Sequence, residues 1–276
     1  MLGKILLHEI RGKSMVKNKK AILVVSFGTS YENSLKDCIE STENFIKESF
    51  KEYDVKRAFT SYMIINKILK RDNIKINNPV EALEELKNEG YEEVIVQPLH
   101  IMFGEEYEKI EKAVSKFKRE FKVLKLGKPL LFKNEDYKIA TEALKTQLPK
   151  LNKEDAIILM GHGTEHPANA AYFQFDYYLR EHINPNMYLC SVESDPSIES
   201  VIPKLNKSGI KKVLLMPFML VAGDHANNDM AGEDEDSWKS ILEKEGFKVE
   251  LYLKGLGANK EFQKIYRDHI KEEMCQ

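Results

Sequence analysis

Four residues at the ends of predicted strands, or in the polar loops that follow them, have side chains that could bind a metal ion or accept a proton. His162 and His166 lie in the segment GHGTEHPAN, Glu193 lies in SVESDPS, and His225 lies in VAGDHANNDMAGEDEDSW. Two imidazoles and a carboxylate, here His162, His225 and Glu193, suit borderline divalent ions such as Co²⁺, Fe²⁺, Ni²⁺ and Zn²⁺. The spacing therefore predicts a metal site, with moderate specificity.

The same residues also have purely structural interpretations. The loop around His162 would suit a tight turn from a strand into a helix that the histidine caps. Glu193 could cap a helix expected to begin at Pro196, although Ser194 and Asp195 are the better capping residues. Because those two neighbours can cap the helix, Glu193 is left without an obvious structural task.

A zinc motif with two histidines on one helical face is not supported. His162 and His166 have the four-residue spacing of that motif, but Gly163 and Pro167 interrupt the helix that it requires. The candidate cluster consists instead of His162, Glu193 and His225, because these lie at the ends of three successive predicted strands.

The remaining histidines and motifs give weaker signals. His100 follows an apolar strand and fits a structural hydrogen bond at least as well as a place near a cleft, while His182 and His269 lie in charged helical stretches and are expected to be solvated. The chain has no GxSxG, Walker or GxGxxG motif. The GHGT loop could bind phosphate through backbone amides, but no arginine is near and the acidic run 233–236 disfavours an anion site.

Strands and helices are predicted to alternate along almost the whole chain. The strands are expected at 21–27, 54–59, 92–99, 121–126, 156–160, 187–193, 212–220 and 248–253, with helices at 35–46, 62–71, 79–89, 107–117, 136–148, 168–182, from 196, 233–245 and 259–273. Such alternation predicts parallel sheets joined by right-handed crossovers. Ligands of these sheets bind beyond the carboxyl ends of the strands, where the candidate residues lie.

The two halves of the chain resemble each other. SFGTS follows the first strand of one half and GHGTEH that of the other, and VIVQPLHIMFGEE aligns without a gap with VLLMPFMLVAGDH. We interpret this as a diverged duplication. It predicts an N-terminal lobe at 19–133, a C-terminal lobe with the metal site at 134–276, and an extension at 1–18.

The composition limits the class of protein. The 276 residues include 42 basic and 44 acidic side chains, giving a net charge of -2, which disfavours a nucleic-acid binder. No stretch approaches the ~20 apolar residues of a membrane span, and Glu9 and Arg11 interrupt the apolar patch near the N-terminus. The three scattered cysteines predict a reduced, cytoplasmic chain.

The segments GHGTEHPAN, SVESDPS, GDHANNDMAGED, SFGTSY and QPLHIMFGEEYEKI resemble the anaerobic-type sirohydrochlorin cobaltochelatases. These are class II chelatases, related to ferrochelatase, and the resemblance runs from about residue 19 to the C-terminus. It implies two α/β lobes around a tetrapyrrole cleft. It also implies His162, Glu193 and His225 as metal ligands, His162 and His225 as catalytic residues, and Glu105 as a catalytic acidic residue on the opposite side of the cleft.

The resemblance also implies the reaction and the partners. The expected activity is insertion of Co²⁺ into sirohydrochlorin or a related precorrin, for anaerobic cobalamin biosynthesis, with release of two protons. Co²⁺ is then a substrate, with Fe²⁺ and Ni²⁺ as alternatives, and no cofactor, nucleic acid or membrane is expected. A non-catalytic tetrapyrrole or metal carrier, a ferrochelatase for sirohaem and a phosphate-handling enzyme remain as alternatives, and the oligomeric state, including a homo-oligomer, stays open.

Overall fold

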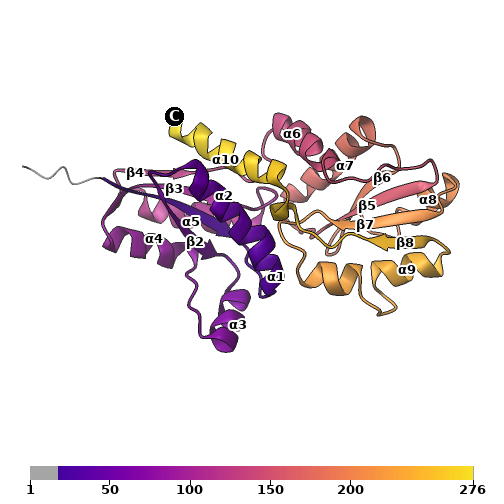
Figure 1. Cartoon of the computed structure of the whole chain (residues 1–276), viewed down its shortest axis with the longest axis horizontal. Coiled ribbons are helices and arrows are strands. Elements are labelled where there is room, and N and C mark those ends of the chain that lie inside the picture. The colour runs from indigo at the N-terminus through magenta and orange to yellow at the C-terminus, as the bar shows by residue number, and fades with distance from the viewer. Residues whose placement is uncertain (1–17, 276) are drawn as a thin grey trace, which may run out of the picture.

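The protein consists of two α/β lobes that lie side by side (Figure 1). The computed structural model describes residues 18–275. Each lobe has a four-stranded parallel sheet, in the order β2-β1-β3-β4 in the first lobe and β6-β5-β7-β8 in the second. The strands are β1 (Lys19–Ser26), β2 (Asp54–Phe59), β3 (Tyr91–Pro98), β4 (Val123–Leu126), β5 (Asp155–Gly161), β6 (Met187–Ser191), β7 (Lys212–Pro217) and β8 (Lys248–Leu251). The expected fold class is confirmed.

Helices flank both sheets and connect successive strands. They are α1 (Glu32–Ser34), the π-helix η1 (Leu35–Glu40), α2 (Ser41–Ser49), α3 (Tyr62–Asp72), α4 (Pro79–Asn88), α5 (Glu105–Phe117), α6 (Asn134–Lys145), the 3₁₀ turn η2 (Pro167–Asn169), α7 (Ala170–His182), α8 (Ile202–Lys207), the π-helix η3 (Ala226–Met230), α9 (Trp238–Lys244), the 3₁₀ turn η4 (Leu256–Ala258) and α10 (Lys260–Cys275). None of the helices described is long and apolar enough to cross a membrane.

The two sheets repeat one register, as a duplication predicts. Pro98 ends β3 beside Val25 of β1, and Pro217 ends β7 beside Met160 of β5. The amide after each proline donates to the carbonyl of that same partner, at 2.7 Å in both lobes. The aligned prolines of the sequence therefore occupy equivalent positions at the carboxyl edges of the two sheets.

Two helices of the second lobe begin later than the sequence predicts. The segment after Pro196 makes turns, and α8 begins only at residue 202, because the Pro196 carbonyl accepts the amide N–H of Ser191 at the end of β6. The acidic run 233–236 precedes α9, which Ser237 caps by accepting the amide N–H three residues on, at 3.1 Å. Strand β6 also ends before residue 193, so Glu193 lies in the bend beyond it.

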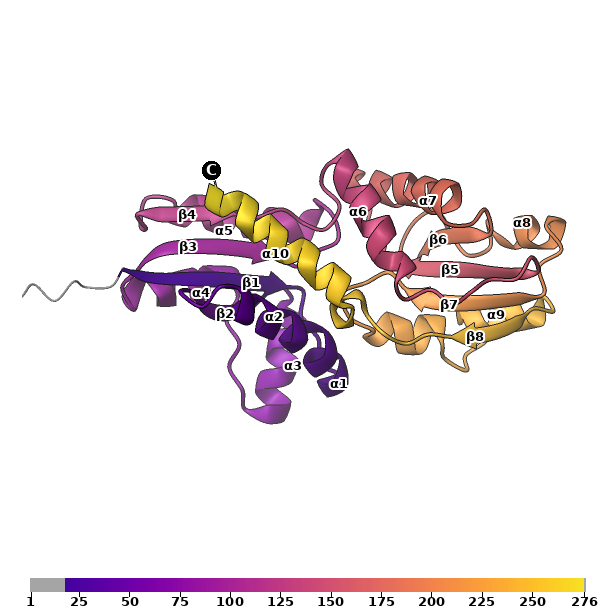
Figure 2. The ribbon, with the colours of Figure 1, turned by 45° about the horizontal axis from the view of Figure 1, so that its top comes forward.

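Helix α10 returns from the second lobe and packs across the first (Figures 1 and 2). It contacts α2 and β3 of the first lobe as well as α6. Tyr266 of this helix is fully buried, and its hydroxyl donates to the carbonyl of Leu99 at 3.1 Å. Because Phe262 and Tyr266 share one hydrophobic cluster with Ile22 of β1 and Phe218 of the second lobe, the helix joins the lobes through a common core.

Helix α10 also corrects one expectation about a histidine. His269 is 3% exposed, not solvated, since it lies on the face of α10 that packs inward, 3.9 Å from Asp136. His182, at the end of α7, is exposed as expected. The lobe boundary predicted at 133/134 falls between β4 and β5 and stays a prediction, and the extension predicted at 1–18 lies almost entirely outside the described residues.

Candidate metal centre

Three of the predicted site residues converge at the carboxyl edge of the second sheet. His162 follows β5 directly, Glu193 lies two residues beyond β6, and His225 lies in the loop after β7. These strands are neighbours in the order β6-β5-β7, so their ends meet at one place. One ligand atom from each side chain lies within 4.8 Å of the other two. The structure thus brings together the set that the strand ends predict.

The backbone around His162 fixes the position of Glu193. The amide of Glu193 donates to the carbonyl of His162 at 2.9 Å. Gly163 has a φ of +86°, and a Cβ at this position would lie 2.6 Å from the Oγ of Ser194. Ser194 in turn accepts the amide N–H of Thr164 at 3.2 Å. A glycine is therefore required here because the loops after β5 and β6 pack directly against each other.

The hydrogen bonds of the two imidazoles define which ring nitrogen is free. Nδ1 of His162 lies 2.9 Å from the carbonyl oxygen of Gly163, and Nδ1 of His225 lies 2.7 Å from a carboxylate oxygen of Asp229. Both partners are acceptors, so each Nδ1 carries the proton and each Nε2 keeps its lone pair. The two rings are perpendicular, with centroids 4.7 Å apart.

The cluster is open to solvent on one side. The exposed fractions of the side chains are 44% for His162, 53% for Glu193 and 31% for His225. A structural zinc site is normally closed by four protein ligands, whereas three ligands with open positions suit an ion that must exchange or react. Two imidazoles and one carboxylate fit Co²⁺, Fe²⁺, Ni²⁺ and Zn²⁺, in agreement with the donor types predicted.

Glu105 does not belong to this cluster. It is exposed and begins α5 in the first lobe, directly after Gly104. The first turn of α5 faces the second lobe, because Glu108 lies 3.2 Å from Nε2 of His166. Since Nδ1 of His166 accepts the amide N–H of Ala168 at 3.1 Å, Nε2 donates to the carboxylate. His166 thus makes a contact between the lobes and caps η2.

Two further contacts between the lobes hold the loop that carries His225. The Tyr31 hydroxyl donates to Asp224 at 2.9 Å, and this bond raises the pKa of Tyr31. The hydroxyl of Ser34 donates to the carbonyl of Ala222 at 2.7 Å. These bonds could not be predicted from the sequence, because their partners are more than 180 residues apart.

His100 lies at the end of β3, on the carboxyl edge of the first sheet. Its Nε2 lies 3.5 Å from the hydroxyl of Thr60, and its Nδ1 is shielded from solvent with no hydrogen-bond partner among residues 18–275. Burial lowers the pKa of His100 to about 4, although the carboxylate of Glu106 acts in the opposite direction. The imidazole is therefore neutral at physiological pH.

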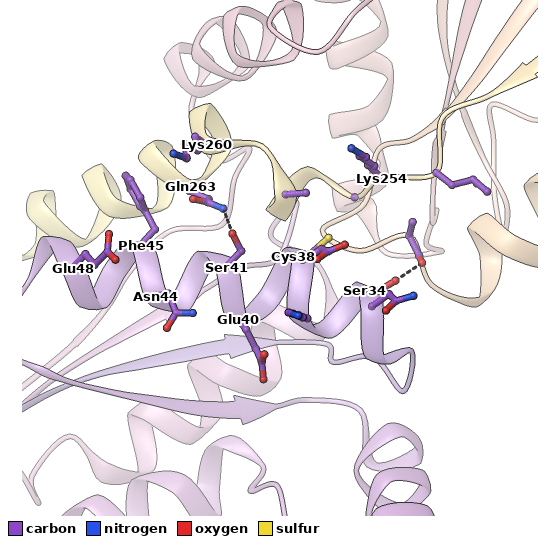
Figure 3. Close-up of a pocket in the computed structure, with 17 residues that line it drawn as sticks. Ser34, Cys38, Glu40, Ser41, Asn44, Phe45, Glu48, Lys254, Lys260 and Gln263 are labelled. Atoms are coloured by element: carbon purple, nitrogen blue, oxygen red, sulfur yellow. Dashed lines mark hydrogen bonds between the residues drawn. The ribbon is translucent and has the colours of Figure 1, made fainter.

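A polar groove occupies another part of the seam between the lobes (Figure 3). It has a volume of about 830 Å³ and is lined by residues of α1, η1, α2 and the segment 253–263, together with Ala222. Figure 3 shows Gln263 donating to Ser41, at 2.9 Å. None of the three clustered residues lines this groove, so it is separate from the candidate metal centre.

Comparison with known proteins identifies relatives over nearly the whole chain. Residues 20–275 match the cobalt chelatase (CbiK) family. The chain is 42% identical over 256 residues to the sirohydrochlorin cobaltochelatase of Salmonella typhimurium. This alignment covers 93% of this chain and 97% of that protein. It is 33% identical over 255 residues to the sirohydrochlorin cobaltochelatase CbiKC of Nitratidesulfovibrio vulgaris, covering 91% and 89% of the two chains.

Solved structures with the same fold include two chelatases of low sequence identity. SirB from Bacillus subtilis with Fe³⁺ has a TM-score of 0.63 at 16% identity, covering 92% of this chain and 95% of that one. CbiX, described as the terminal enzyme of siroheme biosynthesis in denitrifying bacteria, has a TM-score of 0.54 at 14% identity, covering 92% and 99%. These likenesses support the two-lobed fold, and the sequence matches support more: this chain belongs to the cobalt chelatase (CbiK) family.

Proposed function

We propose that this protein inserts Co²⁺ into sirohydrochlorin and releases the two pyrrole protons, in the early-cobalt route to cobalamin. The observation that carries the proposal is the convergence of His162, Glu193 and His225 within 4.8 Å at a strand edge, in a chain of the cobalt chelatase family. The two relatives described above both carry the name of this activity.

In this proposal the three residues hold Co²⁺ before it is transferred. Nε2 of each imidazole offers a lone pair, and the carboxylate of Glu193 completes the set and offsets part of the charge. The ion must then leave these ligands for the four ring nitrogens, so an incomplete, partly exposed sphere suits the task better than a closed one. Co²⁺ is a substrate here, and the proposal includes no cofactor.

Two protons must leave the macrocycle when the metal enters. As the ion moves to the ring nitrogens, the lone pair of each Nε2 becomes free, and a neutral imidazole accepts a proton readily near neutral pH. We therefore assign proton acceptance to Nε2 of His162 and His225. We assign Glu105 a catalytic role on the other lobe, because α5 begins with this residue and its first turn faces the loop of His166. Bending of the macrocycle by binding would expose a nitrogen lone pair to the ion. The free cysteines Cys38, Cys190 and Cys275 fit a cytoplasmic enzyme.

The decisive experiment measures the absorbance change of sirohydrochlorin when Co²⁺, Fe²⁺ and Ni²⁺ are offered singly and in competition. We expect catalytic turnover, with Co²⁺ inserted preferentially. H162A and H225A should lose most of the rate, and E193Q should need a higher Co²⁺ concentration to reach it. The matched variant H182A, which removes an exposed imidazole from the end of α7, should keep the wild-type rate. Stoichiometric binding without turnover would instead identify a carrier, and preferential insertion of Fe²⁺ would identify a ferrochelatase for sirohaem.

A further inference from the structure

We propose that Asp229 is a positioning residue that fixes the tautomer of His225 and makes it the stronger imidazole ligand of the pair. This inference rests on the proposed function, because it assumes that His225 and His162 bind the same ion. It begins from one contact, the 2.7 Å hydrogen bond between Nδ1 of His225 and the carboxylate of Asp229.

The fold holds Asp229 in place independently of any metal. The residue lies in η3, the short π-helix that follows His225. Ala226 and Met230 of this π-helix are both completely buried, on either side of Asp229 in sequence. The side chain of Asn227 also donates to the carbonyl of Gly223, at 2.6 Å. Because packing fixes the backbone, the carboxylate of Asp229 is held where it meets the imidazole.

The two imidazoles of the cluster have different hydrogen-bond partners. Nδ1 of His162 donates to the neutral carbonyl of Gly163 at 2.9 Å, and the nearest carboxylate, 3.5 Å away, is that of Glu193, which the proposed function assigns to the ion. Nδ1 of His225 donates at 2.7 Å to the carboxylate of Asp229, which is not one of the three proposed ligands. A carboxylate behind a metal-binding histidine fixes the tautomer and ring orientation and increases the basicity of the ligating nitrogen. Nε2 of His225 thus binds the ion more strongly than Nε2 of His162. His162 is the ligand from which the ion separates more easily.

Asp229 contributes little to the stability of the fold. Its side chain is 45% exposed and that of His225 is 31% exposed, and a contact this accessible to solvent adds little to the free energy of unfolding. Substitution of Asp229 should therefore leave the protein folded. If Asp229 were purely structural, its substitution would leave the affinity for Co²⁺ unchanged. The Co²⁺ affinity therefore distinguishes a structural role from a positioning role.

The first test measures Co²⁺ binding to the full chain without tetrapyrrole, by calorimetry and by the visible absorption of bound Co²⁺. D229N and D229A should raise the Kd for Co²⁺ by about 10- to 100-fold, and D229E should recover part of the loss. The matched variant D224N removes a negative charge from the same loop while keeping an oxygen that accepts the Tyr31 hydroxyl, and should change the Kd less than twofold. A Kd for D229N within twofold of the wild-type value would overturn the proposal.

A second measurement needs no metal and no activity. Long-range ¹⁵N NMR of the apo protein should show His225 protonated on Nδ1 in the wild type, with this preference lost in D229A. Protonation of the wild-type His225 on Nε2 would overturn the inference. If the wild type inserted no metal while D229A still altered the tautomer and the Co²⁺ affinity, the proposed function would fail and the role of Asp229 would stand.

Discussion

His100 should make the stability of the protein fall in mild acid. Its imidazole lies at the end of β3, and burial lowers its pKa to about 4, against about 6.5 in an unfolded chain. Between these two values the unfolded state binds more protons than the folded state, so the free energy of unfolding decreases as the pH falls. The neighbouring charges act in opposite directions, since Glu106 raises the pKa and Lys109 lowers it.

The size of the effect follows from the two pKa values. At 1.36 kcal/mol per pKa unit, the difference between 6.5 and about 4 corresponds to about 3 kcal/mol over the whole range. Most of this loss falls between pH 7 and pH 5, where the same two values give about 2 kcal/mol. The loss is a substantial fraction of the ~5–15 kcal/mol that stabilise a typical domain.

The assay is urea unfolding at pH 7 and at pH 5 of the wild type, H100Q and the matched variant H182Q. The quantity compared is the change in the free energy of unfolding between the two pH values within each protein. Any pH-independent effect of a substitution on stability therefore cancels. H100Q should lose about 2 kcal/mol less than the wild type on acidification, because glutamine does not titrate. H182Q, altered at an exposed histidine, should follow the wild type. Equal losses in H100Q and the wild type would refute the reasoning.

The remaining predictions concern the metal centre. H162A and H225A should each abolish most insertion activity while changing the free energy of unfolding by about 1 kcal/mol or less, as measured by urea unfolding, because both side chains are partly exposed. G163A should destabilise the protein by about 1–3 kcal/mol and weaken Co²⁺ binding in a calorimetric titration, because the added Cβ would meet Ser194 at a φ of +86°. Insertion at limiting Co²⁺ should slow as the pH falls through the range in which histidines titrate, compared at each pH with a reaction without enzyme. E193Q should keep this acid limb but raise the Co²⁺ concentration needed, whereas a flat profile between about pH 5 and 8 would exclude histidine protonation from the mechanism.

The sequence predicts the metal cluster well because its members share a simple topological property. His162, Glu193 and His225 each follow a strand, and the ends of adjacent parallel strands meet at one edge whatever the details of the helices. The same argument places Glu105 on the other lobe, since it follows β3. The positions of the strands could be predicted from the sequence because buried parallel strands form continuous apolar runs.

Contacts that depend on exact packing were not predictable in this way. The partner of His166 is Glu108, 58 residues away on the other lobe, and the burial of His269 depends on where α10 crosses the first sheet. Asp229 is four residues after His225, a spacing that brings side chains together on a helix, but the sequence predicted a polar loop there and not the short helical segment that forms. The start of α8 shifted because a carbonyl of the expected helix bonds to a strand instead.

The duplication allows the two lobes to be compared at the candidate metal centre. In the sequence alignment of the two halves, Phe27 occupies the position of His162, and Glu106 occupies that of His225. The backbone is equivalent at the first pair, because the glycine after each residue has a left-handed φ, +96° in the first lobe and +86° in the second. Both lobes thus have the same loop framework at the carboxyl edge of the sheet, but the first places a phenylalanine ring, 41% exposed, where the second places an imidazole. Among residues 18–275 a group of three side chains that could hold a metal ion is accordingly found on the second lobe alone, so the side chains, and not the fold, distinguish the two lobes at this edge.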